Sequence, residues 1–181
     1  MQDASATPPQ PREYHGFNWA GFKTLYLREV KRFWKVGVQT LAAPVVTALL
    51  YMMVFVVAVQ GGQPIHGIPY GAFVAPGLMM MQVLSNAFQN ASSSIIQAKM
   101  NGLMGDFLTP PLGAWEQTSA SALGAVTRGL AVGAVTWLAI LPFSHVGLAH
   151  LWAVLFSGVC AALIMAFLGI ATGLWAEKFD H

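Results

Sequence analysis

Polar side chains recur at helical spacing within an otherwise apolar stretch, residues 70–97. The polar positions are Gln82, Asn86, Gln89, Ser93 and Gln97. Intervals of three and four residues place these side chains on one face of a helix. An unpaired side-chain amide in hydrocarbon costs several kcal/mol, so this polar stripe must face other helices or a water-filled path. Two interpretations stay open: hydrogen bonds between helices, or the lining of a path for a solute.

A basic residue, Arg128, lies inside the third apolar stretch. Counting about 20 residues back from Pro142 puts it about five residues inside the cytoplasmic half of a span. At that depth the side chain can reach the lipid headgroups. The alternatives are an ion pair with Glu29 or Glu116, or contact with an anionic group of a substrate.

A short charged loop, residues 97–116, joins the second apolar stretch to the third. Four residues form an apolar knob: Leu103, Met104, Phe107 and Leu108. Lys99 and Asp106 form a polar rim, and Pro110 with Pro111 ends the loop. Apolar anchors inside a polar rim are typical of protein-binding surfaces. Loops of this length also occur as ordinary connectors.

No pattern in the chain indicates catalysis. His145 and His150 lie five residues apart and have no neighbouring carboxylate, so no metal site is predicted. The serines at 92–94 have no His or Asp in helical register. The loop with Gly102 and Gly105 lacks the Lys-Ser/Thr pair of a phosphate-binding loop. We therefore expect no cofactor and no enzyme activity, and any ATP hydrolysis would belong to a partner chain.

Composition indicates an integral membrane protein. Hydrophobic residues make up 56% and charged residues 9% of the chain, against roughly 25% charged residues in soluble domains. The apolar stretches approach the ~20 residues needed to cross hydrocarbon. A net charge of +2 is too small to suggest nucleic acid as a partner. Cys160 lies within an apolar run, which is typical of a packing residue.

These patterns predict an all-α, polytopic fold in three parts. Residues 1–16 are expected to form a disordered cytoplasmic tail, residues 17–35 an interfacial amphipathic helix, and residues 36–181 a transmembrane domain. Four spans are predicted in that domain: 38–59, 70–96, a third ending at Pro142, and 151–175.

The helix predicted at residues 17–35 has an apolar face and a basic face. The two sets are Phe22, Tyr26, Val30 and Phe33, opposite Lys23, Arg28, Lys31, Arg32 and Lys35. Such a helix lies in the membrane interface against anionic headgroups. A solvated helix packed on another domain is the alternative.

Small residues recur at intervals of about four in the last two spans. They are Ala125, Gly129 and Gly133 in the third, and Gly158, Ala162, Ala166, Gly169 and Gly173 in the fourth. Such faces let helix backbones approach closely, which predicts tight packing on neighbouring helices.

Cations indicate the orientation. Arg12 and the basic face of residues 17–35 precede the first span, Lys99 follows the second, and Lys178 lies in the tail. The two opposite loops carry no Lys or Arg. By the positive-inside rule both termini are expected in the cytoplasm.

Four segments, in this order and at this separation, resemble the permease subunit of ABC-2 type exporters. They are VQTLAAPVVTALLY (38–51), FVAPGLMMMQVLSNAFQNASSSIIQAKMNGLMGDFLTPPL (73–112), TRGLAVG (127–133) and GLWAEKFD (173–180). The resemblance is strongest to the bacterial branch that includes drug exporters and nodulation lipooligosaccharide exporters.

This resemblance implies a multi-pass protein of the bacterial inner membrane that exports a small molecule, lipid or glycan. It also implies a cytoplasmic ABC ATPase subunit that docks on the coupling loop at 97–116, and a second permease copy. Members of the family usually have six spans, so the chain is expected to be a partial ABC-2 permease bundle, truncated at its C-terminus. The alternatives are a self-contained channel or secondary transporter that uses the polar stripe, and a truncated remnant that does not transport.

Overall fold

The computed structural model describes residues 16–35, 37–58, 67–105, 109–143 and 150–178. Five long helices form within these ranges: α1 (Trp19–Lys35), α2 (Gly37–Ala58), α3 (Tyr70–Met100), α5 (Ala114–Ile140) and α6 (Leu151–Trp175). Of the described helices, α2, α3, α5 and α6 are long and apolar enough to cross a membrane. The expected all-α polytopic fold is therefore confirmed.

Helix boundaries lie close to those predicted, with one informative difference. Helix α3 continues to Met100 and α5 begins at Ala114, so residues 97–100 and 114–116 of the predicted loop are helical. The connecting segment is thus residues 101–113. Pro44 and Pro76 lie inside α2 and α3, and both helices continue through them. Residues 1–15 of the predicted tail lie outside the described residues.

Asn18 fixes the start of α1 to the start of α5. Its Oδ1 accepts a hydrogen bond from the Gly21 N–H at 3.0 Å, which caps the helix. Its own N–H donates to Glu116 Oε1, and its Nδ2 donates to the Pro111 carbonyl at 3.3 Å. Glu116 Oε2 also accepts from the Gly113 N–H at 2.8 Å. Glu116 is therefore part of a junction between α1, the connecting segment and α5.

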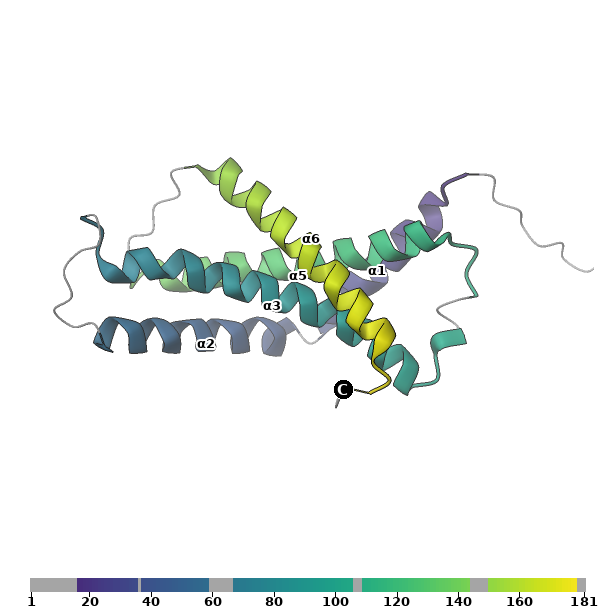
Figure 1. The fold of residues 1–181 in the computed structure, drawn as a ribbon, viewed down its shortest axis with the longest axis horizontal. Helices are drawn as coiled ribbons and strands as arrows, with labels where there is room; N and C mark the ends of the chain where they lie inside the picture. The colour runs from purple at the N-terminus through teal and green to yellow at the C-terminus, as the bar shows by residue number, and fades with distance from the viewer. Residues whose placement is uncertain (1–15, 36, 59–66, 106–108, 144–149, 179–181) are drawn as a thin grey trace, which may run out of the picture.

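Helix α3 is the centre of the bundle because two neighbours approach its backbone closely. A Cβ added at Gly129 of α5 would lie 2.8 Å from the Val83 carbonyl oxygen, and one at Gly169 of α6 would lie 2.5 Å from the Phe88 carbonyl oxygen. Both distances are shorter than carbon can occupy, so these contacts require glycine. Figure 1 shows α6 crossing α3 obliquely while α2 runs alongside it. The close packing predicted from the small residues is confirmed.

Helix α1 packs on α5 through its inner face. Leu25, Glu29 and Phe33 are buried at intervals of four, and Gly124 of α5 lies against the Glu29 side chain. Phe22, Tyr26 and Val30 are half-buried on the same side, whereas the lysines are exposed. The amphipathic division of residues 17–35 is thus present, and its apolar face contacts the bundle. Placement of α1 in the membrane interface stays a prediction.

Helix α2 is held more loosely than the other spans. Its buried residues are Thr40, Ala48 and Met52, and Met52 belongs to a small core with Leu78 and Ile140. Large apolar side chains on the opposite side are exposed: Val46, Leu50, Met53 and Val54. The position of α2 leaves part of the polar side of α3 uncovered.

We expect Gly169→Ala to lower the free energy of unfolding by about 1–3 kcal/mol, because the added methyl group would overlap the Phe88 carbonyl. Gly77→Ala is the matched control, since a Cβ at Gly77 meets nothing within 4 Å. It should be neutral or stabilising by up to about 1 kcal/mol. Equilibrium unfolding in mixed micelles measures both. Equal stability of the two variants would contradict the close contact between α3 and α6.

Candidate functional site

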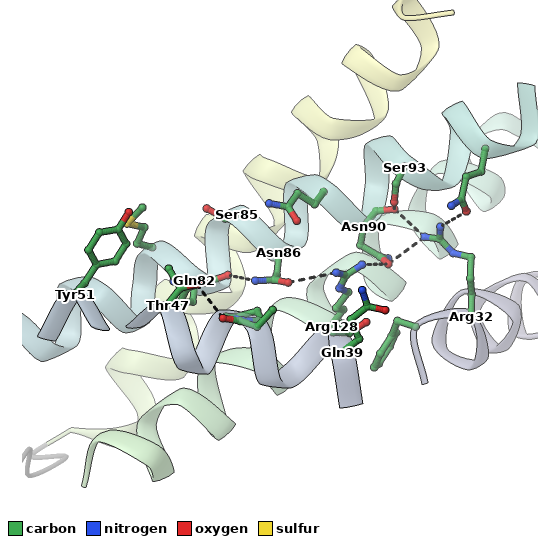
Figure 2. Close-up of a pocket in the computed structure, with 17 residues that line it drawn as sticks. Arg32, Gln39, Thr47, Tyr51, Gln82, Ser85, Asn86, Asn90, Ser93 and Arg128 are labelled. Carbon is green, nitrogen blue, oxygen red and sulfur yellow. Dashed lines mark hydrogen bonds between the residues drawn. The ribbon is translucent and has the colours of Figure 1, made fainter. Parts of the chain in front are cut away.

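A groove of about 690 Å³ lies between α1, α2, α3 and α5. All five residues of the predicted polar stripe line it, together with Arg32 of α1 and Arg128 of α5. Figure 2 shows these side chains converging from separate helices along the polar side of α3. The stripe and the intramembrane arginine, predicted separately, therefore belong to one site.

The polar side of α3 consists of two rows. A buried row repeats at intervals of four, namely Gln82, Asn86, Asn90 and Ser94, and none of these residues is more than 9% exposed. An outer row contains Gln89, Ser93 and Gln97, which are exposed or half-buried. The predicted stripe mixed members of both rows and missed Asn90 and Ser94. Asn90 and Ser94 lie four and eight residues after Asn86, and this helical spacing was the signal that could have identified them.

Arg128 points into the groove. Its Nη1 donates to Asn90 Oδ1 at 3.3 Å and its Nη2 to Asn86 Oδ1 at 3.4 Å, as Figure 2 shows. Within the described ranges, neither Glu29 nor Glu116 forms an ion pair with it. The ion pair of Arg128 with Glu29 or Glu116, one of the alternatives considered from the sequence, is therefore absent from the described residues. The guanidinium contacts the amides of α3 at a position where a groove-bound group could also reach it.

Arg32 approaches the same amide from α1. Its Nη2 donates to Asn90 Oδ1 at 3.0 Å and to the Asn90 carbonyl at 2.9 Å. Two guanidiniums thus donate to one side-chain oxygen. Like charges this close repel, and of the two arginines only Arg32 has a carboxylate partner, Glu29, within the described residues. The groove therefore holds positive charge that favours an anion.

Glu29 pairs with Arg32 on the side of α1 that faces the bundle. Its side chain is 2% exposed, and Oε2 lies 3.1 Å from Arg32 Nη2. Oε1 accepts a hydrogen bond from Ser94 Oγ at 2.9 Å and lies 3.4 Å from Arg28 Nη2. A buried carboxylate needs such partners, since desolvation of an unpaired charge is costly. The spacing of three between Glu29 and Arg32 is visible in the sequence, but the contact of Glu29 with Ser94 is not, because Ser94 lies 65 residues away.

The predicted coupling residues divide into three groups. Leu103, Pro110 and Pro111 are exposed, and Met104 is half-buried. Asp106, Phe107 and Leu108 lie outside the described residues. Leu103, Pro110 and Pro111 are therefore available for contact with another protein.

Lys99 has a different environment from the one expected of a polar rim. Its Nζ donates to the carbonyl of Ala176 at 2.9 Å and to that of Leu174. These carbonyls lie at the C-terminal end of α6, where a helix has unpaired acceptors and partial negative charge. Lys99 therefore links the end of α3 to the end of α6.

The arrangement can bind polar or anionic groups. Among the described residues, no group of three or more His, Cys, Asp and Glu side chains could hold a metal ion. The groove offers amide oxygens and nitrogens, hydroxyls and two guanidiniums. Such groups bind a solute by hydrogen bonds and charge.

Comparison with known proteins places the chain among membrane transporters. The family described as ABC-2 type transporter matches residues 20–181. Proteins named Inner membrane transport permease YadH, from Escherichia coli K12, Escherichia coli O157:H7 and Shigella flexneri, are each 33% identical to it over 168 residues. The match covers 90% of this chain and 64% of each relative, so the chain spans less than two thirds of their length. No solved structure matches the chain.

We expect Glu29→Gln to lower the free energy of unfolding by about 2 kcal/mol or more. The change leaves Arg32 without its carboxylate partner, and the partial exposure of Arg32 keeps the cost below the roughly 3–5 kcal/mol typical of a fully buried pair. Glu177→Gln removes an exposed carboxylate and should change stability by less than about 0.5 kcal/mol. Unfolding in mixed micelles measures both variants. Equal values would show that the Glu29 carboxylate, with its contacts to Arg32 and to Ser94 of α3, does not stabilise the packing of α1 on the bundle.

Proposed function

Because the chain belongs to the ABC-2 type transporter family, we propose that it acts as a membrane-spanning permease subunit of an ATP-driven exporter. The groove on the polar side of α3 supports this role most directly. Buried amides inside a helix that crosses hydrocarbon are costly unless they are satisfied. A groove lined by amides and hydroxyls offers a passing solute those hydrogen bonds. The groove thus forms part of the translocation path for a small molecule, lipid or glycan.

A separate cytoplasmic ATPase supplies the energy in this proposal. The connecting segment between α3 and α5, residues 101–113, is its docking element. Leu103 is 50% exposed there, and apolar anchors of this kind carry much of the binding energy at protein interfaces. Glu116 and Asn18 join the same segment to the start of α1, so a docked ATPase would act on α1 and α5 together.

A second copy of the chain completes the path in this proposal. Helix α2 lines the groove with one side and exposes Val46, Leu50, Met53 and Val54, which do not line it. In a membrane this surface meets either lipid or another protein. A homodimer that joins through α2 would bring two grooves together across its axis.

The proposed orientation places the N-terminus and residues 101–113 in the cytoplasm of a bacterium, at its inner membrane. The basic residues of α1 and Lys99 support it through the positive-inside rule. The relatives' name, inner membrane transport permease, agrees with this location.

The double variant Phe107→Ala with Leu108→Ala should release the ATPase, because it removes the apolar side chains proposed to dock on it. We expect the amount of co-purified ATPase, co-expressed from a neighbouring gene, to fall at least about tenfold, in line with the loss of an interface anchor.

Leu138→Ala with Phe143→Ala is the matched control, since it removes one exposed leucine and one exposed phenylalanine near the opposite end of α5. It should leave capture of the ATPase unchanged. Equal loss in both variants, or in neither, would reject docking at residues 101–113. Solute flux through the purified chain alone in liposomes would favour a self-contained channel instead.

Thiol labelling tests the orientation. In a Cys160→Ser background, Asn101→Cys should react with a membrane-impermeant maleimide only after the inner membrane is opened, whereas His150→Cys should react in intact spheroplasts. Both positions are exposed in the structure, so each thiol can react once the reagent reaches its side. The opposite pattern would overturn the proposed topology and the ATPase docking with it.

A further inference from the structure

The groove contains two cations and no acid among its described lining residues. Arg32 and Arg128 both line it, and the other lining side chains are amides, hydroxyls, aromatic groups and apolar groups. Glu29 pairs with Arg32 and contacts Arg28 and Ser94, but it is not among the residues that line the groove. Arg128 has no carboxylate partner within the described ranges.

Unused hydrogen-bond donors gather at the same place. Arg32 Nε, Arg128 Nε and Asn90 Nδ2 are buried and have no partner in the described structure. Asn90 is itself only 1% exposed. All three atoms are donors, whereas the side-chain oxygens of Asn86 and Asn90 already accept from the arginines. A ligand that supplies negative charge and acceptors to the groove would be attracted to the two guanidiniums and reduce the repulsion between them.

The other end of the groove has a different character. Figure 2 shows Tyr51 at the far end of α3 from Arg32. Ala43 and Pro44 of α2, and Met81 of α3, are apolar residues that also line the groove. The groove therefore combines a cationic end with apolar side chains among its other lining residues.

From this arrangement we infer that the groove binds the anionic headgroup of an amphiphile, with a phosphate or carboxylate held by Arg32 and Arg128. Planar guanidiniums bind such oxyanions through paired, charge-assisted hydrogen bonds. The apolar tail lies along Ala43, Pro44 and Met81. If the bound amphiphile is a transported molecule, the inference rests on the proposed function of the groove as a translocation path. Headgroup binding itself requires no ATPase.

Native mass spectrometry of the purified full chain in a neutral detergent tests the inference. The probe is n-dodecyl phosphate, and n-dodecyl phosphocholine is the matched ligand with the same tail and a zwitterionic head. We expect dodecyl phosphate to bind at least about tenfold more tightly, as charge-assisted hydrogen bonds imply. Equal affinity for the two ligands would overturn the inference.

Variants locate the binding. Arg128→Gln should weaken dodecyl phosphate at least about tenfold. Lys31→Gln removes an exposed cation of α1 that does not line the groove, and it should change affinity less than about twofold. Equal weakening by both would reduce the effect to general surface charge and reject the site.

A third variant keeps the test decisive if Arg128→Gln does not fold. Gln89 is an exposed residue of the groove, and Gln89→Glu places a carboxylate beside the two arginines. It should weaken dodecyl phosphate at least about tenfold while the thermal midpoint stays at or above that of the parent chain. Unchanged affinity in a folded Gln89→Glu variant would reject the site.

The source of the amphiphile is distinguished in a second arm. The chain is reconstituted in nanodiscs of phosphatidylcholine with phosphatidylglycerol, extracted, and challenged with dodecyl phosphate. Retained phosphatidylglycerol would support the anionic site and identify its occupant as a bilayer lipid. Displaced phosphatidylglycerol would support an exchanging, transported amphiphile. If neither anion binds, the inference fails, yet capture of the ATPase through residues 101–113 can still succeed, so the two proposals fail separately.

Discussion

Contact between helix backbones on one side of α3 is the constraint on which the groove depends. Gly129 and Gly169 let α5 and α6 reach the carbonyl oxygens of α3, where any side chain would overlap. Because α5 and α6 pack against that side of α3, its amides turn toward the other side, where α2 packs less completely. The small residues thus determine more than packing density. By fixing the rotation of α3 about its axis, they decide which of its faces borders an open space.

The contacts of Glu29 with Ser94 and of Arg32 with Asn90 make α1 a wall of that space. The sequence suggested a helix that only anchors the chain to the membrane surface. In the structure α1 packs on α5 at Gly124, and Arg32 reaches α3 at Asn90. The Glu29–Arg32 pair lies within α1 and would move with it, but a shift of α1 by one turn would separate Glu29 from Ser94 and Arg32 from Asn90. The register of α1 against the bundle is set in this way.

Periodicity was enough to predict most of the fold but only part of the site. Long apolar stretches gave the four membrane helices, and the fourth was predicted with the bounds found for α6. The polar stripe was predicted because intervals of three and four are visible in one segment. Asn90 was missed although its spacing from Asn86 carried the same signal. The contacts of Glu29 with Ser94 and of Lys99 with Ala176 could not be predicted, because these partners lie 65 and 77 residues away and only the packed bundle brings them together.

Lys99 carries a mechanical consequence. Its ammonium group holds the last carbonyls of α6, and it lies one residue before the end of α3. Any displacement of residues 101–113 that moves Lys99 must either drag the final turn of α6 along or leave those carbonyls without a donor. A displacement of the loop can therefore reach α6, which begins some fifty positions later in the chain. The Lys99 side chain, and not the intervening backbone, makes this connection.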